Sequence, residues 1–157
     1  MNIPPDHPKI KPAKIGVILA NLGTPDATDY WSMRRYLSQF LSDKRVVDYS
    51  SWLWQPLLQG IILTRRPFSS GEAYRSIWNN ELNESPLLTT TRLQSNAVKK
   101  EVEKIYGNDV IVDFAMRYGN PSTESVIKNL KDQGVEKIVF FPLYPQYAGP
   151  TTATAND

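Results

Sequence analysis

Residues 110–141 read VIVDFAMRYGNPSTESVIKNLKDQGVEKIVFF, and this stretch decides the fold. Val110–Ala115 and Lys137–Phe141 are short apolar runs, typical of buried strands. Between them, Ser122–Gln133 has the composition and spacing of a helix, which Gly134 should end. A strand–helix–strand unit pairs its two strands in parallel through a crossover of this kind. The stretch therefore predicts an α/β protein.

Upstream, Ile15–Ala20 is a third apolar run, and it stops at a loop that contains glycine and proline. We expect the next helix to be capped by Asp26 or Thr28 and to end near Ser42. Three parallel strands with helices between them predict a doubly wound, flavodoxin-like sheet. The order of the strands in that sheet does not follow from the sequence.

The middle of the chain predicts more helices. Ser51–Leu63 is rich in Trp, Leu and Ile and is expected to be helical, although a proline and a glycine interrupt it. We expect Arg65–Phe68 to be a loop and Glu72–Trp78 to be a short helix that begins with a capping box. Ser85 is a good cap before a proline at the first helical position, so a long helix should run to about Tyr106.

Composition excludes several classes of function. The chain has 157 residues with a net charge of +2 and no long basic run, which argues against nucleic acid as a partner. It has no cysteine, so disulfides, thiolate zinc sites and thiol nucleophiles are excluded, and a cytoplasmic setting fits best. Residues 1–13 are expected to be a flexible tail, and residues 14–157 a single domain.

Unusual residues follow all three predicted strands. In open parallel sheets, ligands bind beyond the carboxyl ends of the strands. Those ends carry residues 21–25, 116–121 and 142–147, which contain one arginine, three tyrosines and several glycines or prolines. The sequence therefore predicts a ligand site where these three segments meet.

Several short motifs carry a family resemblance. The words ANLGTPD, FLSDKRVVD, EAYRSIW followed by SPL, AMRYGNP and PLYPQY occur in this order. Together they resemble the amino-terminal domain of the ferrochelatases, which insert ferrous iron into a porphyrin in haem biosynthesis. The resemblance covers nearly the whole chain from Lys14 onward. It implies one lobe of the two-lobed chelatase fold, in which the macrocycle lies between the lobes.

The resemblance also implies a set of porphyrin-binding residues. Leu22 corresponds to a residue against the porphyrin face, and Arg66 and Ser85 to contacts with the porphyrin edge and its propionates. Arg117 and Tyr118 correspond to a pair on the deep wall of the site. The full set of candidates is Leu22, Arg65, Arg66, Tyr74, Ser85, Arg117, Tyr118 and Tyr144.

Physical chemistry supports such a set. A porphyrin is a large apolar disc with carboxylates, so its pocket needs apolar faces and a few cations at one edge. Arginine grips a carboxylate through two parallel hydrogen bonds, which favours Arg65 or Arg66 as the propionate partner. On local sequence alone, the same two arginines also fit a solvated loop, and Tyr144 also fits a core aromatic.

By the same resemblance, the family's catalytic histidine and its partner glutamate lie beyond Asp157. We therefore expect no catalytic residue in this chain, which we interpret as a truncated lobe unable to turn over alone. Its single histidine, His7, lies in the predicted tail. Ferrous iron and porphyrin are expected as substrates, with no tightly bound cofactor and no metal site.

Two kinds of contact and three other functions stay open. Trp52–Leu63 is too short to span a bilayer, but it is either core or a lip that touches the membrane, which would make the protein peripheral to the inner membrane face. Self-association is expected through the face that a second lobe would cover.

The alternative functions are a non-catalytic porphyrin or haem-binding module, a chelatase for another tetrapyrrole or metal, and a flavodoxin-like domain for a phosphate-bearing cofactor. Against the last, the loop after the first strand has one glycine and a proline where a phosphate cradle needs several free amides.

Overall fold

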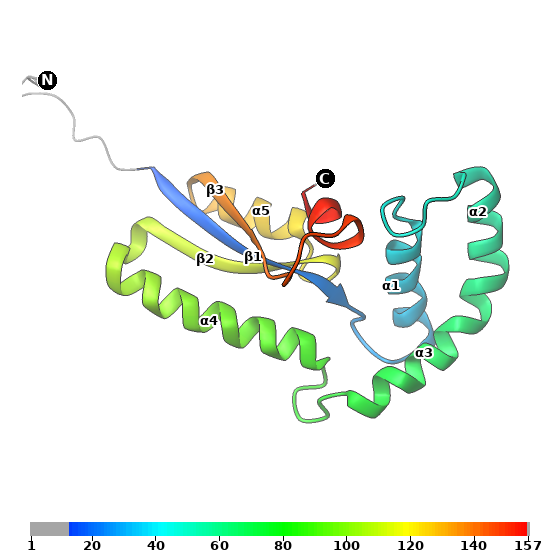
Figure 1. Ribbon diagram of the computed structural model, residues 1–157. Coiled ribbons are helices and arrows are strands. Elements are labelled where there is room, and N and C mark those ends of the chain that lie inside the picture. Colours follow the sequence, from blue (N-terminus) through cyan, green and yellow to red (C-terminus); the bar gives the residue numbers. More distant parts are fainter. Residues whose placement is uncertain (1–12, 157) are drawn as a thin grey trace, which may run out of the picture.

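The computed structural model describes residues 13–156, and Figure 1 shows its elements. Residues 1–12, with nearly all of the predicted tail and His7, lie outside the described part. The strands are β1 (Lys14–Thr24), β2 (Val110–Gly119) and β3 (Val135–Pro142). The α-helices are α1 (Tyr30–Ser42), α2 (Ser51–Leu57), α3 (Leu63–Ile77), α4 (Pro86–Tyr106) and α5 (Thr123–Asp132). Short helical segments are η1 (Leu58–Ile62), η2 (Gly107–Asp109) and η3 (Gly149–Ala153).

The described strands form one parallel sheet in the order β2-β1-β3. β1 pairs along its length with β2, from Ile15 opposite Val110 to Thr24 opposite Gly119. On its other side, β1 pairs with β3 as far as Ala20 opposite Pro142. The α/β, flavodoxin-like class predicted from the sequence is confirmed, and the structure adds the strand order.

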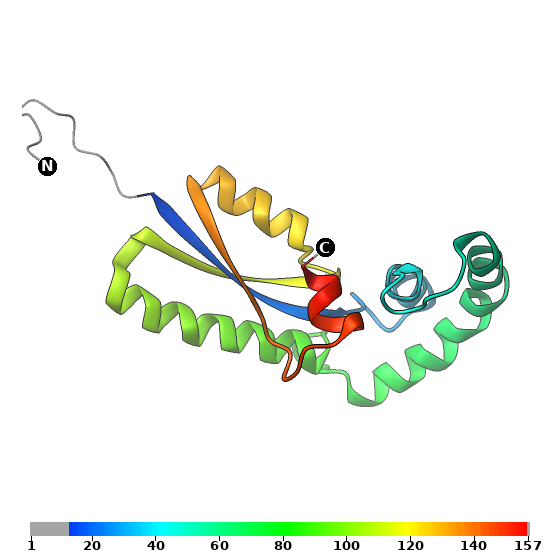
Figure 2. The same ribbon diagram turned by 45° about the horizontal axis from the view of Figure 1, so that its top comes forward.

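Helices α4 and α5 cover opposite faces of this sheet (Figures 1 and 2). Alternation along β1 explains the arrangement, since successive side chains of a strand point to opposite faces. Ile18 packs with Val126 and Leu130 of α5, whereas the Asn21 side chain donates to Thr91 Oγ1 of α4 at 3.0 Å. β1 is therefore buried between two helices, which is why its sequence is an almost continuous apolar run.

Helix α1 begins later than predicted. Its N-cap is Asp29, whose Oδ1 accepts from the backbone N–H of Trp31 at 2.9 Å and of Ser32 at 3.1 Å. The cap prediction of Asp26 or Thr28 was wrong, because Asp26 instead accepts a hydrogen bond from the Asn120 side chain at 2.9 Å. The loop between β1 and α1 is thereby tied to the end of β2.

The predicted loop over Arg65–Phe68 and the separate helix from Glu72 were also wrong, since α3 runs unbroken from Leu63 to Ile77. Pro67 cannot donate to the carbonyl four residues earlier, which belongs to Leu63. That carbonyl accepts instead from the Tyr30 hydroxyl at 3.1 Å and from Arg34 Nη1 at 2.7 Å. Tertiary hydrogen bonds from α1 thus compensate for the proline and let the helix continue.

The other boundaries follow the sequence signals. Ser85 Oγ accepts from Leu88 N at 3.2 Å with Pro86 at the helix start, and α4 ends at Gly107, whose φ is +60°. Ser122 caps α5 in the same way. All three strands are longer than predicted, and β1 includes Gly23 and Thr24, which were expected to lie in a loop. The helix expected over 51–63 is two segments, α2 and η1.

The ends of β1 and β2 approach each other more closely than side chains allow. Gly23 has φ +109°, and a Cβ there would lie 1.8 Å from the carbonyl oxygen of Tyr118. Gly119 has φ +83°, and a Cβ there would lie 2.4 Å from the carbonyl oxygen of Thr24. Both positions need glycine, for conformation as well as for space.

Replacing Gly23 with alanine should therefore destabilise the fold strongly. The new methyl group meets backbone, which cannot rotate away, so we expect the free energy of unfolding to fall by about 3 kcal/mol or more. Urea unfolding followed by circular dichroism measures this. Gly60→Ala is the control, because its Cβ would meet nothing within 4 Å, and it should change stability by less than about 1 kcal/mol. Equal urea midpoints for the two variants would show that the strand ends tolerate a wider spacing.

Candidate functional site

The carboxyl ends of the three strands lie at one edge of the sheet, and α1 lies between that edge and an arm formed by residues 51–77 (Figures 1 and 2). Arg117 and Tyr118 end β2 here, and the Arg117 guanidinium carbon lies 5.4 Å from the centroid of the Tyr118 ring. Tyr144, just after β3, is close enough to interact electrostatically with both. The structure thus brings these three candidates together.

Arg117 and Tyr118 are held by a carboxylate that our sequence analysis did not single out. Asp43, at the end of α1, accepts through Oδ2 from Arg117 Nη2 at 2.9 Å and from the Tyr118 hydroxyl at 2.9 Å. Thr154 Oγ1 donates to the same oxygen and accepts from Arg117 Nε at 2.8 Å. The Asp43 side chain is only 11% exposed. These four residues form one closed network, which we call the Asp43 cluster.

The electrostatics of the cluster favour an ionised Asp43. Burial alone would raise the pKa of Asp43, but hydrogen bonds from Thr154, the backbone of Arg45 and Tyr118, with the charge of Arg117, hold this pKa below its usual range. Burial is also the main cause that raises the pKa of Tyr118, and the neighbouring carboxylate adds to it. At neutral pH the cluster therefore holds a charged Asp43–Arg117 pair and a neutral tyrosine.

Tyr144 adds a buried hydroxyl to this edge. Its oxygen has no hydrogen-bond partner among residues 13–156 and is shielded from solvent. Burial raises the pKa of Tyr144 to about 12, and the nearby Tyr118 adds to the effect while Arg117 opposes it. A buried hydroxyl without a partner is uncommon in native proteins, so this group stands ready for a further hydrogen bond.

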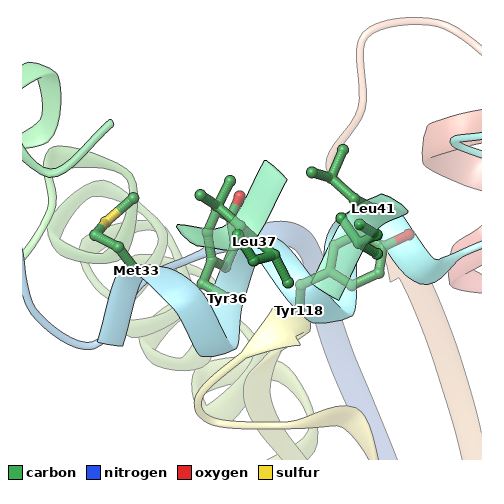
Figure 3. Packing of buried hydrophobic residues seen from close by; sticks show 7 residues of the cluster. Met33, Tyr36, Leu37, Leu41 and Tyr118 are labelled. Carbon is green, nitrogen blue, oxygen red and sulfur yellow. The ribbon is translucent and has the colours of Figure 1, made fainter. Parts of the chain in front are cut away.

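An apolar cluster lies beneath the site, where α1 meets β2 (Figure 3). Tyr118 packs against Phe40 with ring centroids 5.3 Å apart, and Tyr36 packs against Tyr74 of α3 at 6.3 Å. Burial raises the pKa of Tyr36. Leu22 and Tyr74 are partly buried against this cluster, whose buried members are Met33, Tyr36, Leu37, Leu41, Leu58, Leu63 and Tyr118.

A cleft of about 400 Å³ opens beside Arg117 and Tyr118. It is also bordered by Gln39, Ser42 and Asp43 at the end of α1. A second, more apolar hollow of about 360 Å³ lies on α2, lined by Tyr49, Ser50, Leu53, Trp54 and Leu57.

The remaining candidates lie on other elements. Arg65 and Arg66 are exposed on α3, and neither guanidinium has a hydrogen-bond or ion-pair partner within the described residues. Ser85 is 2% exposed, and its hydroxyl serves as the N-cap of α4. It lies beside Glu84, which forms an ion pair with Arg92.

Two other features are absent from the described part of the chain. No group of three or more metal-ligating side chains occurs among residues 13–156. Over the same residues, no helix has the length and apolarity needed to cross a bilayer.

Sequence reasoning missed Asp43 and Thr154 as parts of the site. Asp43 lies in the FLSDKRVVD motif, and an aspartate at the end of an apolar helix was a usable signal. Thr154 gave no such signal, because its role depends on a contact across 111 positions of the sequence.

Comparison with known proteins identifies the family of this chain. The family model described as Ferrochelatase matches residues 14–157. A curated ferrochelatase of Rhodobacter capsulatus is 64% identical over 155 residues, which cover 98% of this chain and 44% of that protein. Ferrochelatases of Rhizobium etli (strain CIAT 652) and Agrobacterium fabrum are each 56% identical, over 98% and 99% of this chain and 44% of their own lengths. The chain thus spans less than half the length of these relatives. On the family match over residues 14–157, this chain belongs to the ferrochelatase family.

Proposed function

We propose that this chain is one lobe of a ferrochelatase and binds a porphyrin at the carboxyl ends of its strands. The observation that carries the proposal is that Arg117 and Tyr118 line a cleft, with Tyr144 near both, at the strand ends where parallel α/β proteins bind ligands. By function the whole enzyme is a metal chelatase of the lyase class, with ferrous iron and porphyrin as substrates and no tightly bound cofactor.

The apolar cluster under the strand ends supplies the wall that a flat macrocycle needs. Leu22 and Tyr74 pack on this cluster yet remain only partly buried. Part of each side chain is therefore free to contact an apolar ring, and such contact is the main source of affinity in cofactor-sized pockets.

The propionates need cations that are not already neutralised. Arg65 and Arg66 meet this requirement, because they are exposed and have no charged partner within the described residues. An arginine without a partner can give both parallel N–H groups to a carboxylate. Ser85 is a weaker candidate, since its hydroxyl is buried at a helix cap.

Iron insertion also requires a base. Two pyrrole N–H protons leave as the divalent ion enters, and a group with a pKa near neutrality accepts them best. The family resemblance assigns this step to a histidine and a glutamate beyond Asp157. We propose that this chain binds the ring and shows little turnover by itself.

A phosphate-binding function is less well supported. Gly23, the glycine expected in the loop after the first strand, lies within β1, and the carbonyl of Tyr118 occupies the space beside it, which leaves no room for a phosphate against that backbone. The glycine serves strand pairing rather than ligand binding.

Porphyrin binding tests the proposal. The chain should bind coproporphyrin or protoporphyrin in absorbance and fluorescence titrations, and Arg66→Ala should weaken binding about tenfold through the loss of a charge-assisted hydrogen-bond pair. Arg66→Lys should lie between the two, since it keeps the charge but loses the paired geometry.

Arg75→Ala is the matched control, because Arg75 is an exposed arginine on the same helix, and it should leave the affinity within about twofold. Porphyrin binding that responds equally to both variants would contradict a specific propionate contact.

Zinc insertion, followed by fluorescence of the metalloporphyrin, tests whether this chain is catalytic or only binds the ring. Efficient turnover by this chain alone would contradict the proposal that it is an incomplete lobe.

We also propose that the arm contacts the cytoplasmic face of a membrane, from which an apolar substrate would arrive. Trp52 is 75% exposed and Leu53 and Ile61 are each 59% exposed, all within α2 and η1. Apolar side chains on an exposed helical segment favour insertion at the membrane interface.

Vesicle flotation tests this contact. The chain should float with vesicles of phosphatidylethanolamine and phosphatidylglycerol, and Trp52→Ser combined with Leu53→Ser should reduce the bound fraction several-fold, since each side chain contributes about 2 kcal/mol when buried. Leu93→Ser on α4, where the leucine is 63% exposed, is the control. Equal flotation of both variants would place the contact elsewhere.

We propose self-association through β3, as the face that a second lobe would cover. Among the described strands, β3 has a neighbour on one side only, and its residues Val139 and Phe141 are about half exposed. Such an edge is open to pairing with another chain. In sedimentation velocity, the mean sedimentation coefficient should rise with concentration, and Val139→Lys should abolish the rise whereas Ile105→Lys on α4 should not. A concentration-independent coefficient for the unsubstituted chain would refute this surface.

A further inference from the structure

The backbone that follows Asp43 fixes its orientation, independently of the side chains that Asp43 binds. Its carbonyl accepts from Val46 N at 3.0 Å and from Val47 N at 2.9 Å, and its Oδ1 accepts from Arg45 N at 2.8 Å. The tight turn after α1 therefore sets the direction of the carboxylate. Oδ2 is left to face the end of β2.

The hydrogens of the Asp43 cluster can be assigned without conflict. Thr154 has one proton, which it gives to Asp43, and its oxygen accepts from Arg117 Nε. Arg117 also donates through Nη2 to Asp43, so two points fix the plane of its guanidinium. The Tyr118 hydroxyl also donates to Oδ2 of Asp43.

Removing the carboxylate would leave Arg117 Nη2 without its acceptor and the Tyr118 hydroxyl with only its longer contact to Thr154 Oγ1, at 3.3 Å. Tyr118 is 4% exposed and cannot turn its hydroxyl to water. The Arg117 side chain is 32% exposed, so part of it reaches solvent. Its Nη1 has no partner within the described residues, and the residue borders the 400 Å³ cleft. Asp43 thus fixes one edge of the guanidinium while the other stays available.

We propose that Asp43, with Thr154, is a positioning residue for porphyrin binding, which it serves by orienting and neutralising Arg117. This inference rests on the proposed function. A charge-compensated guanidinium suits the uncharged ring of the macrocycle, where a bare cation would lose solvation without gaining a carboxylate. The side chains of Arg65 and Arg66 have no carboxylate partner within the described residues and so remain available to the propionates. The lobe therefore uses paired and unpaired arginines for different parts of one ligand.

Asp43→Asn tests the proposal, because the amide has nearly the same shape but cannot form the ion pair. We expect porphyrin affinity to fall about tenfold, within the range for coupled neighbours. In an Arg117→Met background, the same substitution should change affinity less than twofold, since the group that it orients is gone. A merely structural role of Asp43 would give equal losses in both backgrounds and would overturn the proposal.

Asp113→Asn is the matched control, because Asp113 lies on the same strand as Arg117 and accepts only from the next backbone N–H. It should leave porphyrin affinity within about twofold. Thermal melts establish that each variant is folded, and Thr154→Val supplies a milder break of the cluster if Asp43→Asn does not fold. Thr154→Val should also weaken binding, and an unchanged affinity would overturn the role of the cluster.

A measurement without porphyrin separates this inference from the proposed function. In ¹H–¹⁵N spectra, the Nε–H of Arg117 should give a resolved, slowly exchanging signal that shifts or disappears in Asp43→Asn. If the unsubstituted chain binds no porphyrin, the proposed function fails, and the positioning role for it fails too, while this signal still shows whether Asp43 orders Arg117. If porphyrin binds and Arg66→Ala weakens it but Asp43→Asn does not, only the positioning role is overturned.

Discussion

The close approach of β1 and β2 at their carboxyl ends is the constraint on which the site depends. Gly23 and Gly119 let the two backbones pair to the last residue, with Tyr118 opposite Gly23. This pairing fixes the backbone of Tyr118 where its ring meets the apolar side of α1 (Figure 3). Arg117, one residue earlier, is fixed by the same register. Elements from both halves of the chain can then build one site, because the strand ends do not move apart.

Charge is distributed unevenly around this site. The guanidinium of Arg117 is paired with a buried carboxylate, whereas Arg65 and Arg66 of α3 have no charged partner within the described residues. A buried ion pair adds little net stability, since desolvation offsets much of its attraction. The Asp43 cluster is therefore better explained by orientation than by stability, and the free cations by attraction of an anionic ligand.

The sequence predicted the helices and strands whose ends are set by neighbouring residues in the chain. The strand–helix–strand unit and the Ser85 cap of α4 are of this kind, because capping groups and glycines act within one turn. Helix α3 is not, since Pro67 is tolerated only because α1 donates hydrogen bonds to the Leu63 carbonyl. The family resemblance named Arg117 and Tyr118, but their partners come from segments 74 and 36 positions away, where no pattern in the sequence connects them.

Helix α1 joins the two parts of the proposed site, although its 13 residues carry none of the candidate contacts. Near its start, Arg34 binds the Leu63 carbonyl and so fixes the beginning of α3, which carries Arg65 and Arg66. At its end, Asp43 binds Arg117. The separation between the proposed propionate contacts on α3 and the proposed ring contacts at the end of β2 is therefore set by one rigid helix rather than by the loops around it. A macrocycle of fixed size requires a fixed separation, and a helix held by hydrogen bonds at both ends provides one.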